Sequence, residues 1–221
     1  MCNRFALPAS PEEIASEFEL SELPPLPPRY NIAPGESIPV VRASGGSRVL
    51  DSSSWGLTPG WIRDPRKPLL NIRAETLRGR PGRSELARRG RCLVPAGGFY
   101  EWQRLGRARQ PYYYRLKDAP LLGLAALCEG DPSGGAARRC AILTTQPNSL
   151  VAPVHDRMPV IIPRGAYGPW LDPTRELAEL LSLLEPYPAE LMISYPVSTV
   201  VNRTGVEDPR SVEPAKPGTL F

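Results

Sequence analysis

Several features that would place a chain in a familiar class are missing from this sequence of 221 residues. No apolar run approaches the ~20 residues that a membrane-spanning helix needs, and the first twenty residues lack the basic start and apolar core of a signal peptide. The G-x-S-x-G, P-loop and H-E-x-x-H patterns are missing, and no internal repeat or linker divides the chain. We therefore expect one intracellular, cytoplasmic domain without a membrane partner.

Cysteine and histidine are scarce. The four cysteines, Cys2, Cys92, Cys128 and Cys140, include no C-x-x-C pair, and a long chain without an export signal favours reduced thiols. The last three lie in apolar, strand-like segments, so we expect buried structural thiols. Because no metal-ligand spacing is present, we expect no metal site and no cofactor. The single histidine is His155.

Proline and glycine are abundant, with 28 and 19 residues. They interrupt short apolar runs, a pattern typical of a β-rich fold with many turns. Strands and helices do not alternate, so a doubly wound parallel sheet is not expected. We predict an α+β fold with a mostly antiparallel core, a domain over residues 2–202 and an extended or partly disordered tail over residues 203–221.

Local signals place individual elements. Ser10, Pro11 and Glu13 match the N-cap, first-turn proline and capping box of a short helix. A second helix is expected after Ser84, and an amphipathic helix over residues 172–185. Apolar runs bounded by turn residues predict strands over residues 38–42, 48–56, 91–103, 111–116, 120–128, 139–145, 157–162 and 191–201.

The net charge of +4 is unevenly distributed. Between Ile62 and Cys92 the chain carries ten Lys and Arg residues against three Asp and Glu. This stretch is either a solvated surface loop or a face that binds phosphate groups. Trp55 and Trp61 lie just upstream, and aromatic side chains beside arginines are suited to stacking on unpaired bases.

Two titratable side chains are candidates for acid–base chemistry. His155 and its charged neighbours Asp156 and Arg157 lie between apolar runs. It is either a satisfied structural histidine or an acid–base group with a pKa near neutrality. Glu101 follows an apolar strand and two glycines and is flanked by aromatic residues. It is either a surface carboxylate or one in an aromatic-lined cleft, where desolvation would raise its pKa.

A polar trio forms the next candidate. Asn71, Arg73 and Glu75 are spaced by two residues behind an apolar pair, so strand alternation would place them on one face. Either Arg73 and Glu75 form a salt bridge at a sheet edge, or Asn71 and Arg73 orient a ligand through amide and guanidinium hydrogen bonds.

Cys2 directly follows the initiator methionine. If Met1 is removed, Cys2 carries an α-amine and a thiol on adjacent carbons, a pair that no internal cysteine has. Such an aminothiol can form a Schiff base with an aldehyde and then close a five-membered thiazolidine ring. The alternative is a cysteine that is incidental to function.

Seven segments, in this order, resemble the SRAP family, the SOS-response-associated peptidases or abasic-site-processing proteins. They are MCNRF, RYNIAPG, WGLTPGW, NIRAETL, RCLVPAGGFYEW, HDRMPVII and VSTVVN, and they span residues 1 to about 202. The resemblance implies a single SRAP-fold domain with a basic groove. It also implies that the protein recognises abasic sites in single-stranded DNA and crosslinks to them covalently.

The resemblance assigns roles to single residues. Cys2 matches the family's crosslinking cysteine, Asn71 the asparagine that positions it, Glu101 the catalytic glutamate and His155 the catalytic histidine. Positions expected to line the DNA groove or the active site are matched by Arg4, Trp61, Arg73 and Thr144. The implied partner is single-stranded DNA with abasic sites; we expect a monomer, associated with the nucleoid when bound to DNA.

Two positions depart from the family's common pattern. Asn3 stands where glycine commonly follows the cysteine, and it either narrows the entrance of the site or adds a hydrogen bond. Ile72 stands where alanine is common, and we expect it to face away from the polar trio and to affect packing.

Two other functions fit part of the sequence. In the first, Cys2 and His155 are the nucleophile and base of a cysteine peptidase that removes its own Met1 or a short propeptide. That function leaves the basic, aromatic-rich stretch unexplained. In the second, the chain is a nucleic-acid-binding module and Cys2 is incidental, which predicts equal binding to intact and abasic strands.

Overall fold

The structure, a computed structural model, describes residues 3–22, 26–130 and 138–215. The strands are β1 (Phe5–Leu7), β2 (Arg29–Ile32), β3 (Ser37–Ser44), β4 (Ser47–Trp55), β5 (Asn71–Arg73), β6 (Arg91–Ala96), β7 (Gly98–Leu105), β8 (Ala108–Leu116), β9 (Leu122–Glu129), β10 (Arg139–Thr145), β11 (Met158–Pro159), β12 (Ile161–Ile162) and β13 (Met192–Pro196). The α-helices are α1 (Pro11–Phe18), α2 (Pro81–Arg89) and α3 (Tyr167–Leu171). The 3-10 helices are η1 (Ala74–Thr76), η2 (Arg164–Ala166), η3 (Leu177–Leu184), η4 (Ala189–Leu191), η5 (Thr199–Asn202) and η6 (Pro209–Val212).

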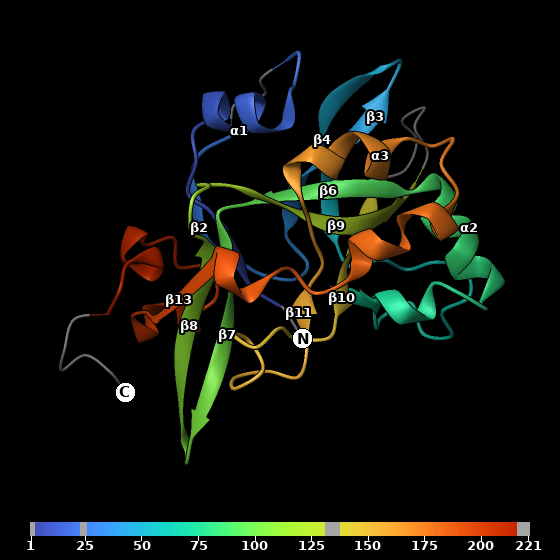
Figure 1. Cartoon of the computed structure of the whole chain (residues 1–221). Helices are drawn as coiled ribbons and strands as arrows, with labels where there is room; N and C mark the ends of the chain where they lie inside the picture. Colours follow the sequence, from blue (N-terminus) through green and yellow to red (C-terminus); the bar gives the residue numbers. More distant parts are fainter. Residues whose placement is uncertain (1–2, 23–25, 131–137, 216–221) are drawn as a thin grey trace.

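The described strands form two sheets (Figure 1). One has the order β13-β8-β7-β1-β2, with every pair antiparallel. In the other, β10 pairs with both β4 and β9, so that β10, β4, β3, β6 and β9 form a closed ring of pairings. Only the pairings of β10 with β4 and β5 are parallel among the described strands. The predicted α+β class with a mostly antiparallel core is confirmed.

Residues 91–103, predicted as one strand, form two strands that belong to different sheets. The change of sheet occurs at Gly97 and Gly98, where the backbone passes very close to other parts of the chain. A Cβ atom on Gly97 would lie 2.6 Å from the Pro8 ring, and one on Gly98 would lie 2.4 Å from the Tyr114 carbonyl oxygen. Only glycine fits such approaches, so this pair directs β7 away from the ring of strands.

The predicted helices have mixed outcomes. The capping box of α1 is confirmed, with Ser10 accepting from the Glu13 amide and Glu13 accepting from the Ser10 amide. The prediction that Ser84 caps a helix is wrong, because α2 already begins at Pro81 and the Ser84 hydroxyl donates to the Leu77 carbonyl. Residues 172–185 contain the 3-10 helix η3 in place of the predicted amphipathic helix. No helix in the described ranges is both long and apolar enough to span a membrane.

The hydrophobic core fills the space between the sheets, and Trp55 belongs to it. Its ring is fully buried and packs at 5.4 Å from that of Phe5, while its indole N–H donates to the Leu70 carbonyl. Trp55 therefore has no free face for a base, and the prediction that it helps to form a stacking platform is wrong.

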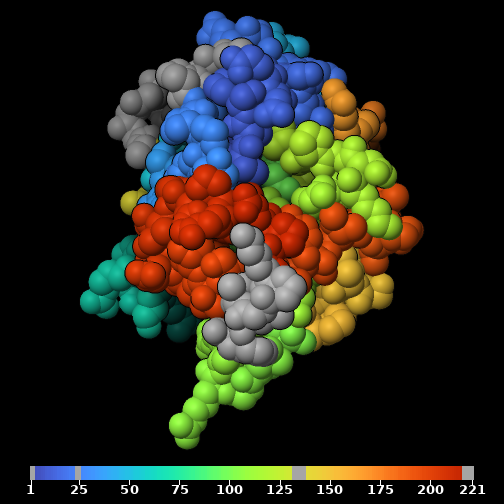
Figure 2. Space-filling model, turned by 90° about the vertical axis from the view of Figure 1, so that its left-hand side faces the viewer, coloured from blue at the N-terminus to red at the C-terminus, as the bar shows by residue number. Residues whose placement is uncertain are grey.

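The C-terminal residues contact the first sheet, with η5 next to β8 and η6 next to β2, and they form the red surface in the middle of Figure 2. The Glu207 carboxylate accepts hydrogen bonds from the backbone amides of Tyr30 and Asn31 in β2. Val197 and Pro214 form an isolated bridge. Residues 216–221, the end of the predicted tail, lie outside the described residues, and the domain boundary at residue 202 stays a prediction.

Candidate functional site

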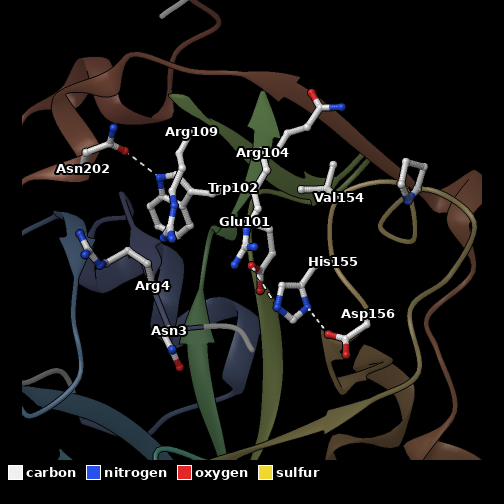
Figure 3. Close-up of a pocket in the computed structure, with 12 residues that line it drawn as sticks. Asn3, Arg4, Glu101, Trp102, Arg104, Arg109, Val154, His155, Asp156 and Asn202 are labelled. Atoms are coloured by element: carbon white, nitrogen blue, oxygen red, sulfur yellow. Dashed lines mark hydrogen bonds and ion pairs between the residues drawn. The ribbon is translucent and has the colours of Figure 1, made fainter. Parts of the chain in front are cut away.

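A cleft of about 820 Å³ opens beside β7, where that strand continues beyond its neighbour β1 (Figure 3). The two strands pair only at Phe5 with Phe99 and at Ala6 with Gly98. Because β1 does not follow β7 further, the edge of β7 from Glu101 onward faces the cleft. The lining residues are Asn3, Arg4, Glu101, Trp102, Gln103, Arg104, Arg109, Pro153, Val154, His155, Asp156 and Asn202.

Glu101 is buried at the floor of this cleft, with 4% of its surface exposed. Burial, with a smaller contribution from the nearby Asp156 carboxylate, raises its pKa to about 7. Its Oε2 atom lies 4.0 Å from Nε2 of His155, and its Oε1 atom has no hydrogen-bond partner among the described residues. The surface-carboxylate interpretation is therefore wrong, and Glu101 is able both to donate and to accept a proton at neutral pH.

His155 is fixed by the residues that follow it. The Arg157 backbone N–H donates to Nδ1 over 2.9 Å, so Nδ1 is the acceptor and the proton of the neutral ring is on Nε2. The Arg157 carbonyl oxygen and the Asp156 carboxylate also lie 3.1 Å from Nδ1, but neither has a proton to donate. Desolvation lowers the His155 pKa. A mainly neutral imidazole thus points its Nε2–H edge toward Glu101.

Asn71 joins the start of the chain to the second sheet. It lies in β5, opposite Ile142 of the buried strand β10. Its Nδ2 atom donates to Oδ1 of Asn3 over 2.8 Å, whereas its own Oδ1 is buried and unpaired within the described ranges. Asn3 thus adds a hydrogen bond, one of the two effects predicted for it. Ile72 is 2% exposed and belongs to the core, as predicted.

The predicted face of Asn71, Arg73 and Glu75 does not form. The strand ends at Arg73, and the 3-10 helix η1 turns Glu75 toward Arg157. The Arg157 guanidinium binds both Glu75 oxygens, at 2.7 and 2.8 Å, and also donates to the Thr144 carbonyl. Only 5% of the Arg157 side chain is exposed. Its buried guanidinium therefore links η1 and β10 to the loop of residues 146–157, which carries His155.

The four predicted DNA-contacting residues occupy different environments. Arg4 lines the cleft, donates to Asn31 and the Val201 carbonyl, and lies 5.7 Å from the centre of the Trp102 ring. Arg73 is exposed at the end of β5, directly opposite Thr144 in β10. Thr144 is fully buried, and its hydroxyl has no partner in the part of the chain that the structure describes.

Trp61 is not among the residues that line the cleft and lies just before the basic stretch. Its side chain is 40% exposed, an unusual state for a large aromatic residue. The Arg83 guanidinium covers its ring at 5.2 Å, and Gly82 packs so closely that a Cβ there would lie 2.7 Å from the indole. Part of the Trp61 surface therefore stays accessible beside the Arg83 guanidinium.

Sequence reasoning missed one group of cleft residues, which surrounds Trp102. The Trp102 indole N–H donates to Oδ1 of Asn202 over 2.6 Å, which fixes the ring. Arg104 and Arg109 line the cleft from the projecting arm of β7 and β8. The only signal in the sequence was the cluster of arginines after the GGFYEW segment.

Cys2 lies outside the described residues, so its predicted role stays a prediction. The three internal cysteines form a cluster, with Sγ atoms of Cys92 and Cys128 2.8 Å apart and Cys140 directly opposite Cys128. They are reduced, and Cys92 and Cys140 are buried as predicted, while Cys128 is half-buried. Within the described ranges, no cluster of His, Cys, Asp and Glu side chains is arranged to hold a metal ion.

The fold and this cleft define the class of protein. The chain belongs to the SOS response associated peptidase (SRAP) family, whose model matches residues 1–204. A solved structure from Bacteroides thetaiotaomicron superimposes with a TM-score of 0.85 at 26% identity, over 97% of this chain and 100% of that chain.

Relatives in bacteria and vertebrates are similar over most of this chain. Abasic site processing protein YoqW of Bacillus subtilis is 36% identical, over 96% of this chain and 99% of that protein. Abasic site processing protein HMCES of Xenopus tropicalis is 31% identical, over 80% of this chain and 63% of that protein. Abasic site processing protein YedK of Escherichia coli is 28% identical, over 97% of this chain and 100% of that protein.

Proposed function

We propose that this protein processes abasic sites in single-stranded DNA by forming a covalent thiazolidine with Cys2, after removal of Met1. The observation that carries this proposal is the hydrogen bond from Asn71 to Asn3, the covalent neighbour of Cys2, at a cleft that Glu101 and His155 also line. The relatives named abasic site processing proteins support the substrate.

The first step is formation of an imine. An abasic deoxyribose exists as a closed hemiacetal and an open aldehyde, and His155 moves a proton at the ring oxygen to open it. The α-amine of Cys2 then attacks the aldehyde carbon, and a water molecule leaves. Because an α-amine has an ordinary pKa of about 7.7–8.0, a useful fraction is neutral at pH 7.

The second step closes the ring. The thiol sulfur adds to the imine carbon, and its proton is transferred to the imine nitrogen. Two carbons separate sulfur from nitrogen in Cys2, so closure gives a five-membered ring and is effectively intramolecular. Glu101, with its pKa raised to about 7, carries protons in imine formation and in its reversal.

The imine also permits a side reaction. Loss of a proton from the sugar carbon next to the imine expels the 3′ phosphate by β-elimination, which predicts weak lyase activity. Ring closure competes with this cleavage, so the thiazolidine would protect the strand from breaking at the lesion.

Strand binding is assigned to the basic stretch together with the cleft. Arg73 is exposed beside Asn71, and Trp61 offers a stacking face next to Arg83. Arg4 lines the cleft itself, and Thr144 lies opposite Arg73. Contacts to phosphate by arginine release counterions, so affinity for DNA should fall as the salt concentration rises.

The test is incubation with an abasic single-stranded oligonucleotide, followed by heating and denaturing electrophoresis. The wild type should give a heat-stable shifted band, and Cys2→Ser should give only an imine that is lost on heating unless borohydride reduces it. A heat-stable band with Cys2→Ser would falsify the thiazolidine. Peptide turnover without any shifted band would favour a peptidase, and equal binding of intact and abasic strands without a crosslink would favour a simple binding module.

A further inference from the structure

The hairpin of β7 and β8 projects from the rest of the molecule and is strongly basic. Figures 1 and 2 show its tip standing clear of the neighbouring segments. Residues 102–117 contain five Arg and Lys residues and no Asp or Glu. The tip also carries Leu105, whose exposure of 39% is unusual for leucine. Like charges held close together oppose folding, so a basic hairpin without acidic residues of its own is expected to have a function that offsets this cost.

Arg104 and Arg109 face each other across this hairpin. They are directly opposite residues in the antiparallel register, so their side chains leave the same face of the ribbon. Both are exposed, and neither guanidinium has an ion pair or hydrogen bond with any described residue. Two like charges placed opposite each other destabilise a pair of strands. The protein therefore keeps this pair at a cost to its own stability.

The arginines of the basic stretch are arranged differently. Arg88 and Arg89 both form ion pairs with Glu85, and Arg66 pairs with Asp64. Those charges are partly neutralised within the protein. Both arginines of the hairpin pair, in contrast, lack a carboxylate partner among the described residues, so both guanidinium groups are available to bind an anion from outside.

The position of the pair indicates which anion. Arg104 and Arg109 line the same cleft as Glu101 and His155. In Figure 3, Arg4, Trp102 and Arg109 lie on one side of Glu101, while His155 and Asp156 lie on the other. The partly exposed ring of Trp102, fixed by Asn202, adjoins this basic side. Guanidinium groups beside an aromatic ring are suited to a nucleotide, through its phosphate and its base.

We propose that Arg104 and Arg109 clamp the phosphodiester of a nucleotide adjacent to the lesion, so that the hairpin is a strand-binding arm. This inference rests on the proposed function for its ligand, single-stranded DNA. It adds that the strand passes over the hairpin side of the cleft as well as along the basic stretch. The clamp positions the strand and takes no part in the bond-forming steps.

The experiment compares Arg104→Ala/Arg109→Ala with Arg107→Ala, which removes an exposed charge from the tip of the same hairpin but does not line the cleft. Binding of an intact single-stranded oligonucleotide is measured by fluorescence anisotropy over a range of salt concentrations. The double variant should bind about 10-fold or more weakly, and the slope of log affinity against log salt should fall by about 0.7, since the clamp neutralises one phosphate and each phosphate contact contributes roughly 0.7 for single strands. Arg107→Ala should change affinity less than about 2-fold.

Two further readouts distinguish loss of the clamp from misfolding and from a loss of chemistry. Removal of like charges should leave the melting temperature of the double variant equal to or above that of the wild type, so weak binding would not reflect misfolding. At saturating DNA, the double variant should still form the heat-stable crosslink, because the proposed chemistry uses other residues.

Three results would overturn the clamp. The first is wild-type affinity in the double variant, and the second is an equal loss in Arg107→Ala. The third is that an acidic peptide binds the wild type and loses affinity in the double variant, while the affinity for DNA does not change. Since intact DNA is the probe, these outcomes do not depend on crosslinking. A loss of DNA binding in the double variant would support the clamp even if Cys2 formed no covalent product.

Discussion

Asn71 holds Asn3 through a hydrogen bond of 2.8 Å between the two side chains, from Nδ2 of Asn71 to Oδ1 of Asn3. This contact ties the beginning of the chain to β5, and β5 is in turn paired with the buried strand β10. The residue next to Cys2 is therefore held by the core of the fold. Such an anchor reduces the freedom of a terminal segment, which would otherwise have to be ordered during the reaction.

Asn71→Ala should slow crosslinking by about 10- to 100-fold, because misplacement of a reacting group by about 1 Å has effects of that size. Single-turnover rates at saturating abasic DNA measure the effect. Asn3→Ala is the matched control, since it removes the same hydrogen bond but keeps the Asn71 amide in the site. We expect it to slow the reaction by a similar factor, because the anchor of the N-terminal segment is lost in both variants. A loss confined to Asn71→Ala would contradict the anchor and would mean that Asn71 acts through a contact other than the one to Asn3.

The raised pKa of Glu101 predicts a particular dependence of stability on pH. A buried carboxyl with a pKa of about 7 binds its proton more tightly in the folded than in the unfolded protein. Its contribution to stability therefore becomes less favourable as pH rises from about 4.5 to 7. Relative to the wild type, Glu101→Gln should gain unfolding free energy over this range, on the order of 3 kcal/mol. Urea denaturation at several pH values tests this, and a constant difference between the two proteins would contradict it.

The same substitution should affect the reaction more than the fold. Glu101→Gln cannot exchange protons, so we expect crosslinking to slow by roughly 10²- to 10⁴-fold. The wild-type rate should show an inflection near pH 7, and the residual rate of the variant should lack it. Binding of intact single-stranded DNA, measured in parallel, should be unchanged within about 2-fold, which separates chemistry from affinity.

The pair of Arg157 and Glu75 should stabilise the loop that carries His155. The Arg157 guanidinium lowers the pKa of Glu75, so its stabilising effect is present at neutral pH and is lost as pH falls through the lowered pKa. Glu75→Gln should cost on the order of 2 kcal/mol at pH 7, less than a fully buried pair would, because the Glu75 side chain is 46% exposed. Glu190→Gln, at an exposed position without an ion pair among the described residues, is the control. Equal unfolding free energies for the two variants would rule out this role.

The internal cysteines should resist alkylation in the folded protein. Burial raises the pKa of the Cys92 thiol, and close contact within the cluster holds those of Cys128 and Cys140 well above their ordinary value. Thiols in that state are poor nucleophiles. Iodoacetamide at pH 7, followed by peptide mass spectrometry, should modify these three only after unfolding in urea. If any internal site reacts in the native protein, we expect Cys128 first, because it is half-buried. Rapid native labelling of Cys140 would be inconsistent with the cluster.

Local signals in the sequence predicted local structure well. The capping box at Ser10 depends on contacts within four residues, and it forms as predicted. Ile72 was expected to affect packing, and it is buried in the core. These features follow from periods and short-range hydrogen bonds that the sequence itself contains.

Features that depend on distant contacts were not predictable in this way. Glu101 faces the cleft because β1 stops pairing with β7 before that residue, and the loop that carries His155 lies beside its carboxylate. Both elements are far from Glu101 in the sequence. Glu75 leaves the expected face because Arg157, 82 residues away, binds its carboxylate. Residues 91–103 pass from one sheet to the other at Gly97 and Gly98, where Pro8 and Tyr114 pack too closely for a larger residue to fit. In each case the deciding partner lies in another element.

The most direct measurement is mass spectrometry of the intact protein before and after reaction with an abasic single-stranded oligonucleotide. The free protein should lack the mass of Met1. The product should have the summed mass of protein and oligonucleotide less one water, since imine formation releases water and ring closure releases nothing. Digestion should place the whole adduct on the N-terminal peptide that begins with Cys2. An adduct on another peptide, or a crosslink formed by protein that retains Met1, would contradict the thiazolidine.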